Sequence, residues 1–363
     1  MKSLCVGGAM IDTIAIIDSD RIERMTMLNA ETSFLLLEEG RKTEAQEIST
    51  HVGGGAVNAA VAMARLGLDA ALLAKLGTDT RADTILASLA RDGVSSRWTM
   101  RDQRAPTGAS VLVSSHDRNA AIFTFRGANT LLEIADLRDE AFAVDIVYIA
   151  NLSNQSADCF PAIVRRAKAG GALVAANPGP RQLSARGQAF LENLAAIDIL
   201  VLNRTEADLL VPSLVARYGE GGPKLALAPG EDAPALAARG LASGGFEMGL
   251  AAFFSAVTRL GPKYVVVTDG ARGAFAGSQS EILFAPALPA HVVGTAGAGD
   301  AFAATFTTYV VLGCPSELAL RAAAINSAAV VGHIDTQTGL LRRQEIDRRL
   351  ASPETLGIRR WTV

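Results

Sequence analysis

A regular alternation of short apolar strands and helices over residues 146–268 most limits the folds open to this chain. The elements expected there are, in order, strands at 146–150, 172–176, 199–202 and 264–268, with helices at 161–169 and near 188–194. Strands that alternate with helices form a parallel sheet covered by helices on both faces. Ligands of such sheets bind at the carboxyl ends of the strands, where this sequence carries its glycine and polar clusters. An α/β fold with a mostly parallel central sheet is therefore predicted.

Two stretches, 13–50 and 107–125, instead show the short alternating pattern of small antiparallel strands. We expect them to form a small β lid, while residues 1–12, 51–106 and 126–363 form the main nucleotide- and substrate-binding domain. Residues 212–249 also break the rhythm, since they are rich in Gly, Pro and Ala. They are predicted to be a surface insertion with one short helix at 234–239.

Composition excludes several classes of protein. Of the 363 residues, 49% are hydrophobic and 20% are charged, so a large core is expected and disorder is not. The formal net charge of −3 and the lack of interleaved basic and aromatic residues argue against nucleic-acid binding. Three widely spaced cysteines suit a reduced cytoplasm, the location we expect. No apolar run reaches the roughly 18 residues of a membrane span.

The glycine-rich stretch from Val292 to Phe302 carries the most chemistry. A β-branched pair leads into Gly294, Gly297 and Gly299, then Asp300 and an apolar run, which predicts a strand, a tight turn and a helix start. The free N–H groups of a helix start bind anions, and glycines let a ligand approach the backbone. A carboxylate beside such a site is suited to accepting a proton, so we interpret Asp300 as a general base. The alternative is a glycine turn with Asp300 as a helix cap.

A second glycine turn, Gly53–Gly55, leads into another helix, with Asn58 one turn inside it. Asp12 follows the first strand and its two glycines. Taken alone, Asp12 fits a strand-end turn as well as a ligand contact. Asn58 is harder to explain as structure, because its neighbours in the helix are alanine and valine.

In their order and spacing these motifs resemble those of the ribokinase-like, PfkB-type carbohydrate kinases over nearly the whole chain. The matching segments are Gly7-Gly8 with Asp12, residues 53–58, 127–129, 177–180, 203–206, 268–273 and 297–300. The resemblance implies a three-layer α/β/α fold with an inserted β lid. It also implies an ATP- and Mg²⁺-dependent kinase that phosphorylates a hydroxyl of a sugar, a sugar derivative or a nucleoside.

By this resemblance each motif has a role in phosphoryl transfer, which requires positioning, charge neutralisation and a base. Asp300 matches the base, and the N–H groups of Gly297, Ala298 and Gly299 match the anion hole. Asp12, Gly54 and Asn58 match contacts to substrate hydroxyls. Asn203 and Glu206 match the motif that organises phosphate and Mg²⁺, the latter through water. Thr268, Gly270 and Gly273 would line the nucleotide. Asn326 would lie near adenine, or else be a polar residue packed between helices.

Three departures from the family pattern bear on specificity. Gly55 and Ser153 stand where ribokinases carry Lys and Glu as sugar contacts, so ribose itself is doubtful as the substrate. Gly294 stands where the family usually has an Asp that helps hold K⁺, so K⁺ dependence is doubtful.

Two alternatives remain open at this point. A nucleoside kinase on the same scaffold would need an aromatic slot for the base, and only 5% of residues are aromatic, with Phe34 alone in the first lid stretch. A sugar is therefore favoured. The other alternative is a non-catalytic sugar-binding or sensor protein. A homodimer through the lid strands is also expected, because it would pair free strand edges and cover either Leu35 and Leu37 or Phe34 and Leu36.

Overall fold

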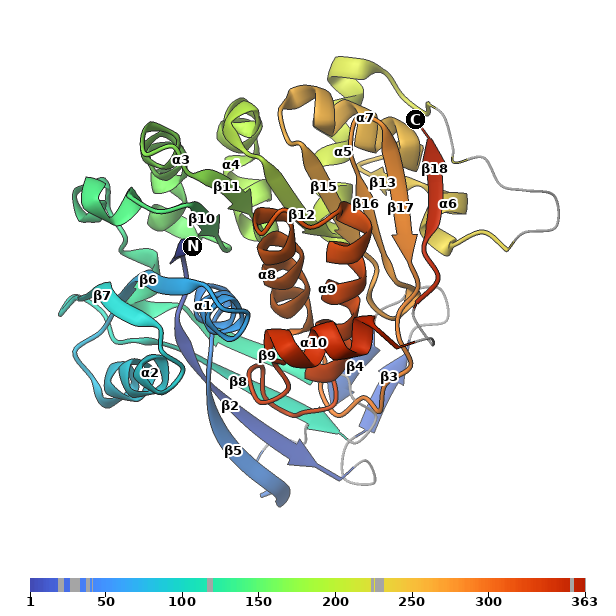
Figure 1. Ribbon diagram of the computed structural model, residues 1–363. Helices are drawn as coiled ribbons and strands as arrows, with labels where there is room; N and C mark the ends of the chain where they lie inside the picture. Colours follow the sequence, from blue (N-terminus) through green and yellow to red (C-terminus); the bar gives the residue numbers. More distant parts are fainter. Residues whose placement is uncertain are drawn as a thin grey trace.

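A large mixed β-sheet forms the centre of the molecule (Figure 1). The computed structural model describes residues 1–18, 23–26, 33–36, 40, 42–115, 120–222, 225, 232–352 and 356–362. The sheet has ten strands in the order β18-β17-β16-β15-β12-β11-β10-β1-β6-β7. The parallel strands are β1 (Lys2–Val6), β6 (Asp69–Leu76), β7 (Ser95–Arg101), β10 (Ile146–Ile149), β11 (Leu173–Ala176), β12 (Ile199–Asn203) and β15 (Tyr264–Thr268). The antiparallel strands are β16 (Ala274–Gly277), β17 (Glu281–Ala285) and β18 (Arg359–Thr362).

Helices cover both faces of this sheet and define two separate hydrophobic cores. One face carries α1 (Gly55–Arg65), α2 (Thr80–Arg91), α8 (Ala298–Val311), α9 (Ser316–Val330) and α10 (Arg343–Leu350). The other carries α3 (Phe160–Ala169), α4 (Pro180–Glu192), α5 (Arg204–Tyr218), α6 (Ala235–Arg239) and α7 (Leu250–Leu260). Successive residues of β1 alternate between them, since Leu4 and Val6 face one core and Cys5 the other. The predicted three-layer α/β/α fold is confirmed. None of the described helices has the length and apolar character needed to cross a membrane.

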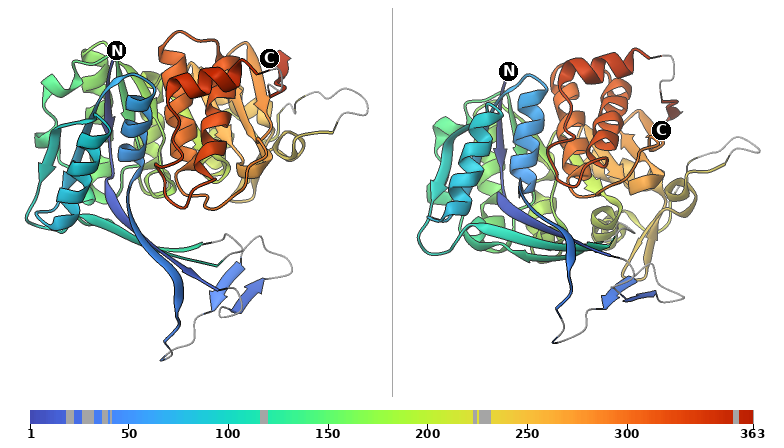
Figure 2. Two further views of the ribbon diagram at one scale, coloured as in Figure 1. Left: turned by 60° about the horizontal axis from the view of Figure 1, so that its bottom comes forward. Right: turned by 90° about the horizontal axis from the view of Figure 1, so that it is seen from below.

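A second, four-stranded sheet projects from one end of the body (Figure 2). Its strands, in spatial order, are β5 (Ala45–Gly53), β2 (Met10–Ile17), β8 (Gly108–Ser115) and β9 (Ala120–Phe125). A separate ribbon pairs β3 (Glu23–Thr26) with β4 (Ser33–Leu36). Two of these strands, β2 and β5, extend slightly beyond the predicted lid stretch 13–50, while β8 and β9 lie within 107–125. The division into lid and main domain stays a prediction. Leu37 lies outside the described residues, and for Phe34 and Leu35 only the backbone pairing is described.

Some predicted element boundaries were wrong. No strand forms at Val292 and Val293, because the N–H groups of Val293 and Gly294 bond instead to the carbonyl of Val331, after α9 (2.7 and 3.2 Å). The helix expected near 188–194 begins at Pro180, a residue that suits a first helical turn. Residues 212–218 belong to α5, which continues through Pro212.

The rest of the predicted 212–249 insertion is partly built into the body. Its helix α6 lies where expected, and its strands β13 (Leu241–Ser243) and β14 (Phe246–Met248) pair with each other. Leu236, Leu241 and Met248 are at most 2% exposed and belong to the core that α5 and α7 share. Alternating apolar residues were too few in this stretch to reveal the two short strands.

Candidate active site

The first turn of α8 presents backbone N–H groups and a carboxylate together. Gly297 is the N-cap residue, with a left-handed φ of 78°, and a Cβ at this position would lie 2.6 Å from Cβ of Thr336. A Cβ on Gly299 would meet nothing within 4 Å, so the space beside this turn is open. Asp300 lies in the same turn but makes no capping hydrogen bond. The helix-cap alternative is therefore not what the contacts show.

Asn58 holds the Asp300 carboxylate. Its Nδ2 donates to Oδ2 of Asp300 at 2.8 Å. Its Oδ1 accepts from Thr336 Oγ1 at 2.9 Å and from Gln337 Nε2 at 3.2 Å. These two donors define which end of the Asn58 amide carries the oxygen, and the NH₂ group must then point at Asp300. Thr336 and Gln337 were not among the predicted site residues, although the polar run 335–338 after an alanine-rich helix was a usable signal.

The surroundings of Asp300 raise the pKa of its carboxyl group above the usual value. Burial raises the pKa of Asp300, the hydrogen bond from Asn58 lowers it, and the negative charge of Asp12 raises it again, with a net rise above the usual value. A carboxylate with a raised pKa is a stronger base than an ordinary one. This is the property that a general base for a hydroxyl group needs.

Asp12 lies on β2, on the face of the lid sheet that looks toward Asp300. In register, Asp12 is opposite His51 on β5 and Ser110 on β8, and the Ser110 hydroxyl donates to its carboxylate. A Cβ on Gly53 would lie 1.9 Å from Oδ2 of Asp12, so only glycine fits beneath this carboxylate. Burial raises the pKa of Asp12, while the Ser110 hydrogen bond and the His51 charge oppose that rise.

The glycines before α1 bring backbone segments into contact. Gly54, the N-cap of α1, has φ 102°, and a Cβ there would lie 2.6 Å from the carbonyl oxygen of Gly8. A Cβ on Gly55 would lie 3.3 Å from Oδ1 of Asp300. A lysine at position 55 would therefore start its side chain against the candidate base. The glycine turn places Gly7-Gly8, Asn58 and Asp300 around one point.

Asn203 and Glu206 form a reciprocal cap at the start of α5. The N–H of Asn203 donates to Oε2 of Glu206 (2.8 Å), and the N–H of Glu206 donates to Oδ1 of Asn203 (2.9 Å). Burial raises the pKa of Glu206 to about 7, and the charge of Asp300 contributes to that rise. Its other oxygen, Oε1, has no hydrogen-bond partner among the described residues. One free oxygen on a buried carboxylate fits a Mg²⁺ that is held mainly by water and phosphate.

The remaining nucleotide candidates lie at the carboxyl end of β15. Thr268 is paired with Asn203 of β12, so the two predicted motifs are side by side. Gly270 has φ 57° with open space beside it. Gly273 has φ 103°, and a Cβ there would lie 2.3 Å from the carbonyl oxygen of Ala285. Asp269, between Thr268 and Gly270, is buried and accepts two hydrogen bonds of 2.8 Å from Arg272.

Asn326 needs a correction, because its side chain is fully buried between α8 and α9. Its Nδ2 donates to Thr305 Oγ1, and its Oδ1 accepts from the N–H of Leu341, both at 2.8 Å. The amide is used within the protein on both sides, so the contacts match the alternative of a polar residue packed between helices. We do not retain it as an adenine contact.

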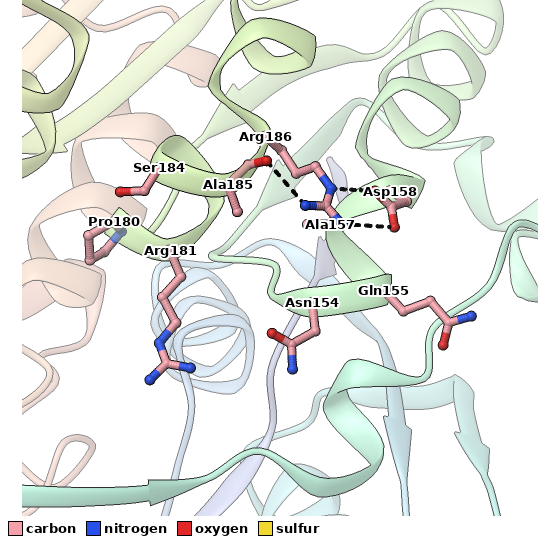
Figure 3. A pocket seen from close by; sticks show the side chains of 9 residues that line it. All are labelled: Asn154, Gln155, Ala157, Asp158, Pro180, Arg181, Ser184, Ala185 and Arg186. Atoms are coloured by element: carbon pink, nitrogen blue, oxygen red, sulfur yellow. Dashed lines mark hydrogen bonds and ion pairs between the residues drawn. The ribbon is translucent and has the colours of Figure 1, made fainter.

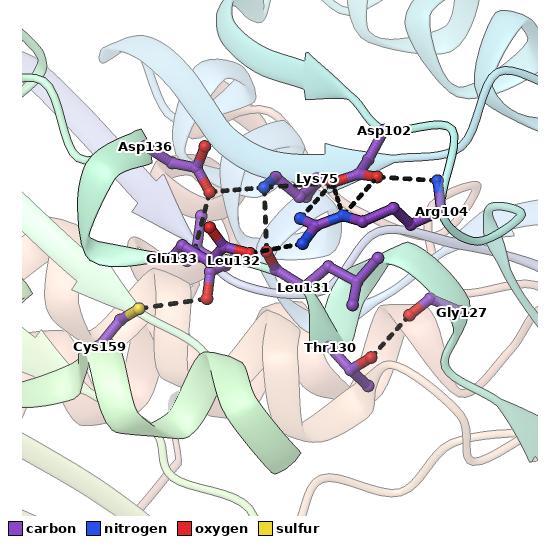
Figure 4. A network of polar contacts seen from close by, with 10 residues as sticks. All are labelled: Lys75, Asp102, Arg104, Gly127, Thr130, Leu131, Leu132, Glu133, Asp136 and Cys159. Carbon is purple, nitrogen blue, oxygen red and sulfur yellow. Dashed lines mark hydrogen bonds and ion pairs between the residues drawn. The ribbon is translucent and has the colours of Figure 1, made fainter.

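A narrow pocket adjoins Gly7 and Gly8. It is lined by Gly7, Gly8, Met10, Lys75, Arg126, Asn129, Leu132, Asn151, Leu152 and Ser153. Lys75 is 6% exposed and forms ion pairs with Asp136 (2.7 Å) and Asp102 (3.3 Å), while its Nζ also donates to the carbonyl of Leu131 (Figure 4). Asn129 Oδ1 and Nδ2 bond to the N–H and carbonyl of Ala9 (3.0 and 2.8 Å). Arg126, just before the predicted motif 127–129, was missed by the sequence analysis.

Comparison with known proteins finds relatives in sequence and in fold. A deoxyribokinase from Salmonella typhi is 26% identical over 345 residues, which span 94% of this chain and 99% of the relative. An Arabidopsis thaliana ribokinase solved with ribose and ATP superposes with a TM-score of 0.70 at 22% identity, over 97% of this chain and 99% of that one. An E. coli protein described as a ribokinase II, solved with ATP and Mg²⁺, gives 0.73 at 18% identity, over 96% and 98%.

The family model described as "pfkB family carbohydrate kinase" matches residues 4–221 and 236–343. That match covers both glycine turns, the Asn203–Glu206 cap and the start of α8. The predicted resemblance is thereby confirmed, and the chain is a phosphotransferase that belongs to the pfkB family of carbohydrate kinases.

Proposed function

We propose that this protein transfers the γ-phosphoryl group of ATP to a hydroxyl of a small sugar or sugar derivative. The observation that carries the proposal is the Asp300 carboxylate, held by Asn58 beside the open first turn of α8. The base and the anion site then lie within one helical turn of each other. In-line transfer needs this proximity of the attacking oxygen and the transferred group.

In the proposed mechanism Asp300 accepts the proton of the substrate hydroxyl as the hydroxyl oxygen bonds to the γ-phosphorus. The bond from that phosphorus to the bridging oxygen breaks, and ADP leaves. The N–H groups of Gly297, Ala298 and Gly299 hold the oxygens of the transferring group at the positive end of the α8 dipole. Asn58 keeps the carboxylate in position. Asp12 and the backbone at Gly54 orient the rest of the substrate through its other hydroxyls.

ATP and Mg²⁺ belong to the proposal, because two structures with this fold were solved with ATP, one of them also with Mg²⁺. Glu206 would hold Mg²⁺ through water, and the ion would neutralise phosphate charge during transfer. Asn203, Thr268, Gly270 and Gly273 would line the nucleotide at the carboxyl ends of β12 and β15. With Gly294 in place of a carboxylate, we expect K⁺ to be of little importance.

The register of the lid supports a sugar over a nucleoside. Thr124 of β9 is paired with Ser110 and thereby lies on the same face as Asp12, while Phe123 and Phe125 lie on the opposite face. The residues of β2, β8 and β9 that share the Asp12 face carry no aromatic ring among those described. Apart from the His51 imidazole of β5, which lies opposite Asp12, a nucleobase would lack aromatic stacking partners on this face of the described lid strands.

The test is a screen of ATP consumption over neutral sugars, sugar acids, sugar phosphates and nucleosides, with the phosphorylated product identified by mass spectrometry. Turnover of at least one sugar or sugar derivative is expected, and it should disappear when Mg²⁺ is chelated. Turnover of nucleosides alone would favour the nucleoside-kinase alternative. Normal sugar binding with no transfer to any acceptor would favour the non-catalytic alternative.

The proposed assembly is a homodimer through the lids. On the face opposite Asp12, Ile48, Val111, Phe123 and Phe125 are 68%, 44%, 60% and 53% exposed. The strands β5 and β9 are the edges of this sheet. Exposed apolar faces with free strand edges are adhesive, and a second lid would cover both features. Light scattering at micromolar concentration should give about twice the chain mass of 37.8 kDa, and a monomer would contradict the assembly.

A further inference from the structure

A cavity of about 720 Å³ lies between η5 (Asn154–Cys159) and the first turns of α4. It is lined by Asn154, Gln155, Ala157, Asp158, Pro180, Arg181, Ser184, Ala185 and Arg186. Figure 3 shows Arg181 and Asn154 extending into the same space, whereas Arg186 turns toward Asp158. Asn154 has φ 53°, the left-handed region, and is the one non-glycine residue with positive φ in the described part of the chain.

This cavity and the narrow pocket beside Gly7 and Gly8 share one wall. Residues 151–153 line the narrow pocket, and Asn154 and Gln155 line the cavity. A Cβ on Gly179 would lie 2.8 Å from Cβ of Asn151, so the start of α4 contacts this wall. On its other side the wall approaches the candidate base, since a Cβ on Gly55 would lie 3.4 Å from Cβ of Ala150. Residues 150–155 thus run from the surroundings of Asp300 along the narrow pocket to the cavity.

Most charges along this path are neutralised within the protein. Lys75 has Asp102 and Asp136 as partners. Arg186 pairs with Asp158, with Nε 2.6 Å from Oδ1. Asp158, which lines the cavity, and Asp102 and Asp136, which pair with Lys75 of the narrow pocket, are thus already engaged. No negative charge within the described ranges is left over for a further cation on these walls.

Arg126 and Arg181 are the exceptions. Neither guanidinium has an ion-pair or hydrogen-bond partner among the residues that the structure describes. Arg126 is half-buried, and burial together with the positive charge of Arg181 holds its pKa below the usual value. Two cations that repel each other, one of them half-buried and without a counter-ion, destabilise the ligand-free protein. An anion placed between them would remove that cost.

We propose that the substrate carries an anionic group, a carboxylate or a phosphate, which Arg126 and Arg181 bind while the hydroxyl to be phosphorylated faces Asp300. The inference rests on the proposed kinase function and specifies its substrate class as sugar acids or sugar phosphates. Guanidinium groups suit both anions, because their N–H donors match pairs of carboxylate or phosphate oxygens. Asn154 adds an amide donor on the same wall.

The decisive experiment measures binding, so that it does not depend on turnover. Calorimetric titrations compare D-ribose with D-ribose 1-phosphate, and D-glucose with D-gluconate, for the wild type, Arg126→Gln and Arg181→Gln. The anionic member of at least one pair should bind at least roughly 10-fold more tightly, and each substitution should weaken it by roughly 10- to 100-fold, the range for hydrogen bonds to charged groups. The anion that binds identifies the source, phosphate or carboxylate.

Arg186→Gln is the matched control, because it removes an arginine from the same cavity whose charge Asp158 already neutralises. It should leave anion affinity nearly unchanged. The inference would be overturned if both members of each pair bound with equal affinity and neither arginine variant lost affinity. Kinase turnover of neutral sugars would in that case leave the proposed function standing. If anion binding depended on the two arginines but no phosphoryl transfer occurred, the anion site would be supported and the proposed kinase function would be contradicted.

Discussion

The two ends of the candidate substrate site differ in how their polar groups are partnered. At the transfer end, Asp300 is bonded to Asn58, which in turn is bonded to Thr336 and Gln337. At the far end, Arg126 and Arg181 have no partner in the described structure, although Lys75 beside them has two carboxylates. Groups that perform the same chemistry on every substrate can be held by hydrogen bonds within the protein. Groups that select a substrate must keep their hydrogen-bonding atoms available to it.

The largest effect is expected from removing Lys75, which has ion-pair partners, and the comparison with Arg126, which has none among the described residues, tests that difference. Lys75→Met should lower the free energy of unfolding by about 3 kcal/mol, because Asp136 loses its cation while Asp102 keeps Arg104 as a partner. Arg126→Met removes a cation that has no partner and should leave stability unchanged or raise it. Urea unfolding of both variants gives the comparison. Equal destabilisation would mean that Arg126 is structural too.

The second effect concerns the transfer end alone. Asp300→Asn should lower kcat by roughly 10²-fold or more, since the amide is nearly isosteric but cannot accept a proton. Nucleotide and substrate affinities, measured by calorimetry, should stay close to those of the wild type. A variant with a near-normal rate would show that Asp300 is not the base.

A smaller effect should come from the residue that positions the base. Asn58→Ala removes a hydrogen bond that lowers the pKa of Asp300, so that pKa should rise further. Because the base works only when deprotonated, activity is lost as pH falls through this pKa. The acid limb of the kcat/KM profile should therefore move to higher pH, with a loss of roughly 10-fold at neutral pH. An unshifted limb would indicate that Asn58 acts on substrate binding instead.

The smallest expected effect is that of potassium. The Gly294 position lacks a carboxylate, so a bound K⁺ would lose an attraction on the order of 1 to 4 kcal/mol at effective dielectrics of about 80 to 20. A Cβ on Gly294 would lie 3.0 and 3.2 Å from the carbonyl oxygens of His333 and Ile334, which shows how closely the backbone fills this place. Initial rates against KCl, at constant ionic strength with a large organic cation as replacement, should vary little. Strong, saturable activation would contradict this.

The parts of the site that depend on local backbone geometry could be predicted from the sequence. Glycine turns before helices have few alternative explanations, so Gly54, Gly297 and Asp300 were located without the structure. The three-layer fold followed from the spacing of apolar strands. Val292 and Val293 show the limit, because a β-branched pair fits a strand equally well as a loop that bonds to Val331.

Long-range polar pairing could not be predicted. Asn58 and Gln337 are 279 residues apart, and nothing in either segment indicates that they meet. For Asn326 the family resemblance implied an adenine contact and packing between helices was the alternative, and its partners Thr305 and Leu341 could not be identified from spacing. The same limit hid Arg126, since its lack of a counter-ion is visible only when every neighbouring carboxylate has been assigned.

The double hydrogen bond between Asn129 and the backbone of Ala9 has a consequence for selectivity. Ala9 lies three residues before Asp12, and Asn129 lies three residues after Arg126. The distance between Asp12 and Arg126, the two proposed substrate contacts, is therefore fixed by hydrogen-bonded backbone and not by flexible side chains alone. Because this distance is fixed, the site should distinguish substrates by their length. Substrates that carry the same functional groups but differ in chain length should bind with different affinities.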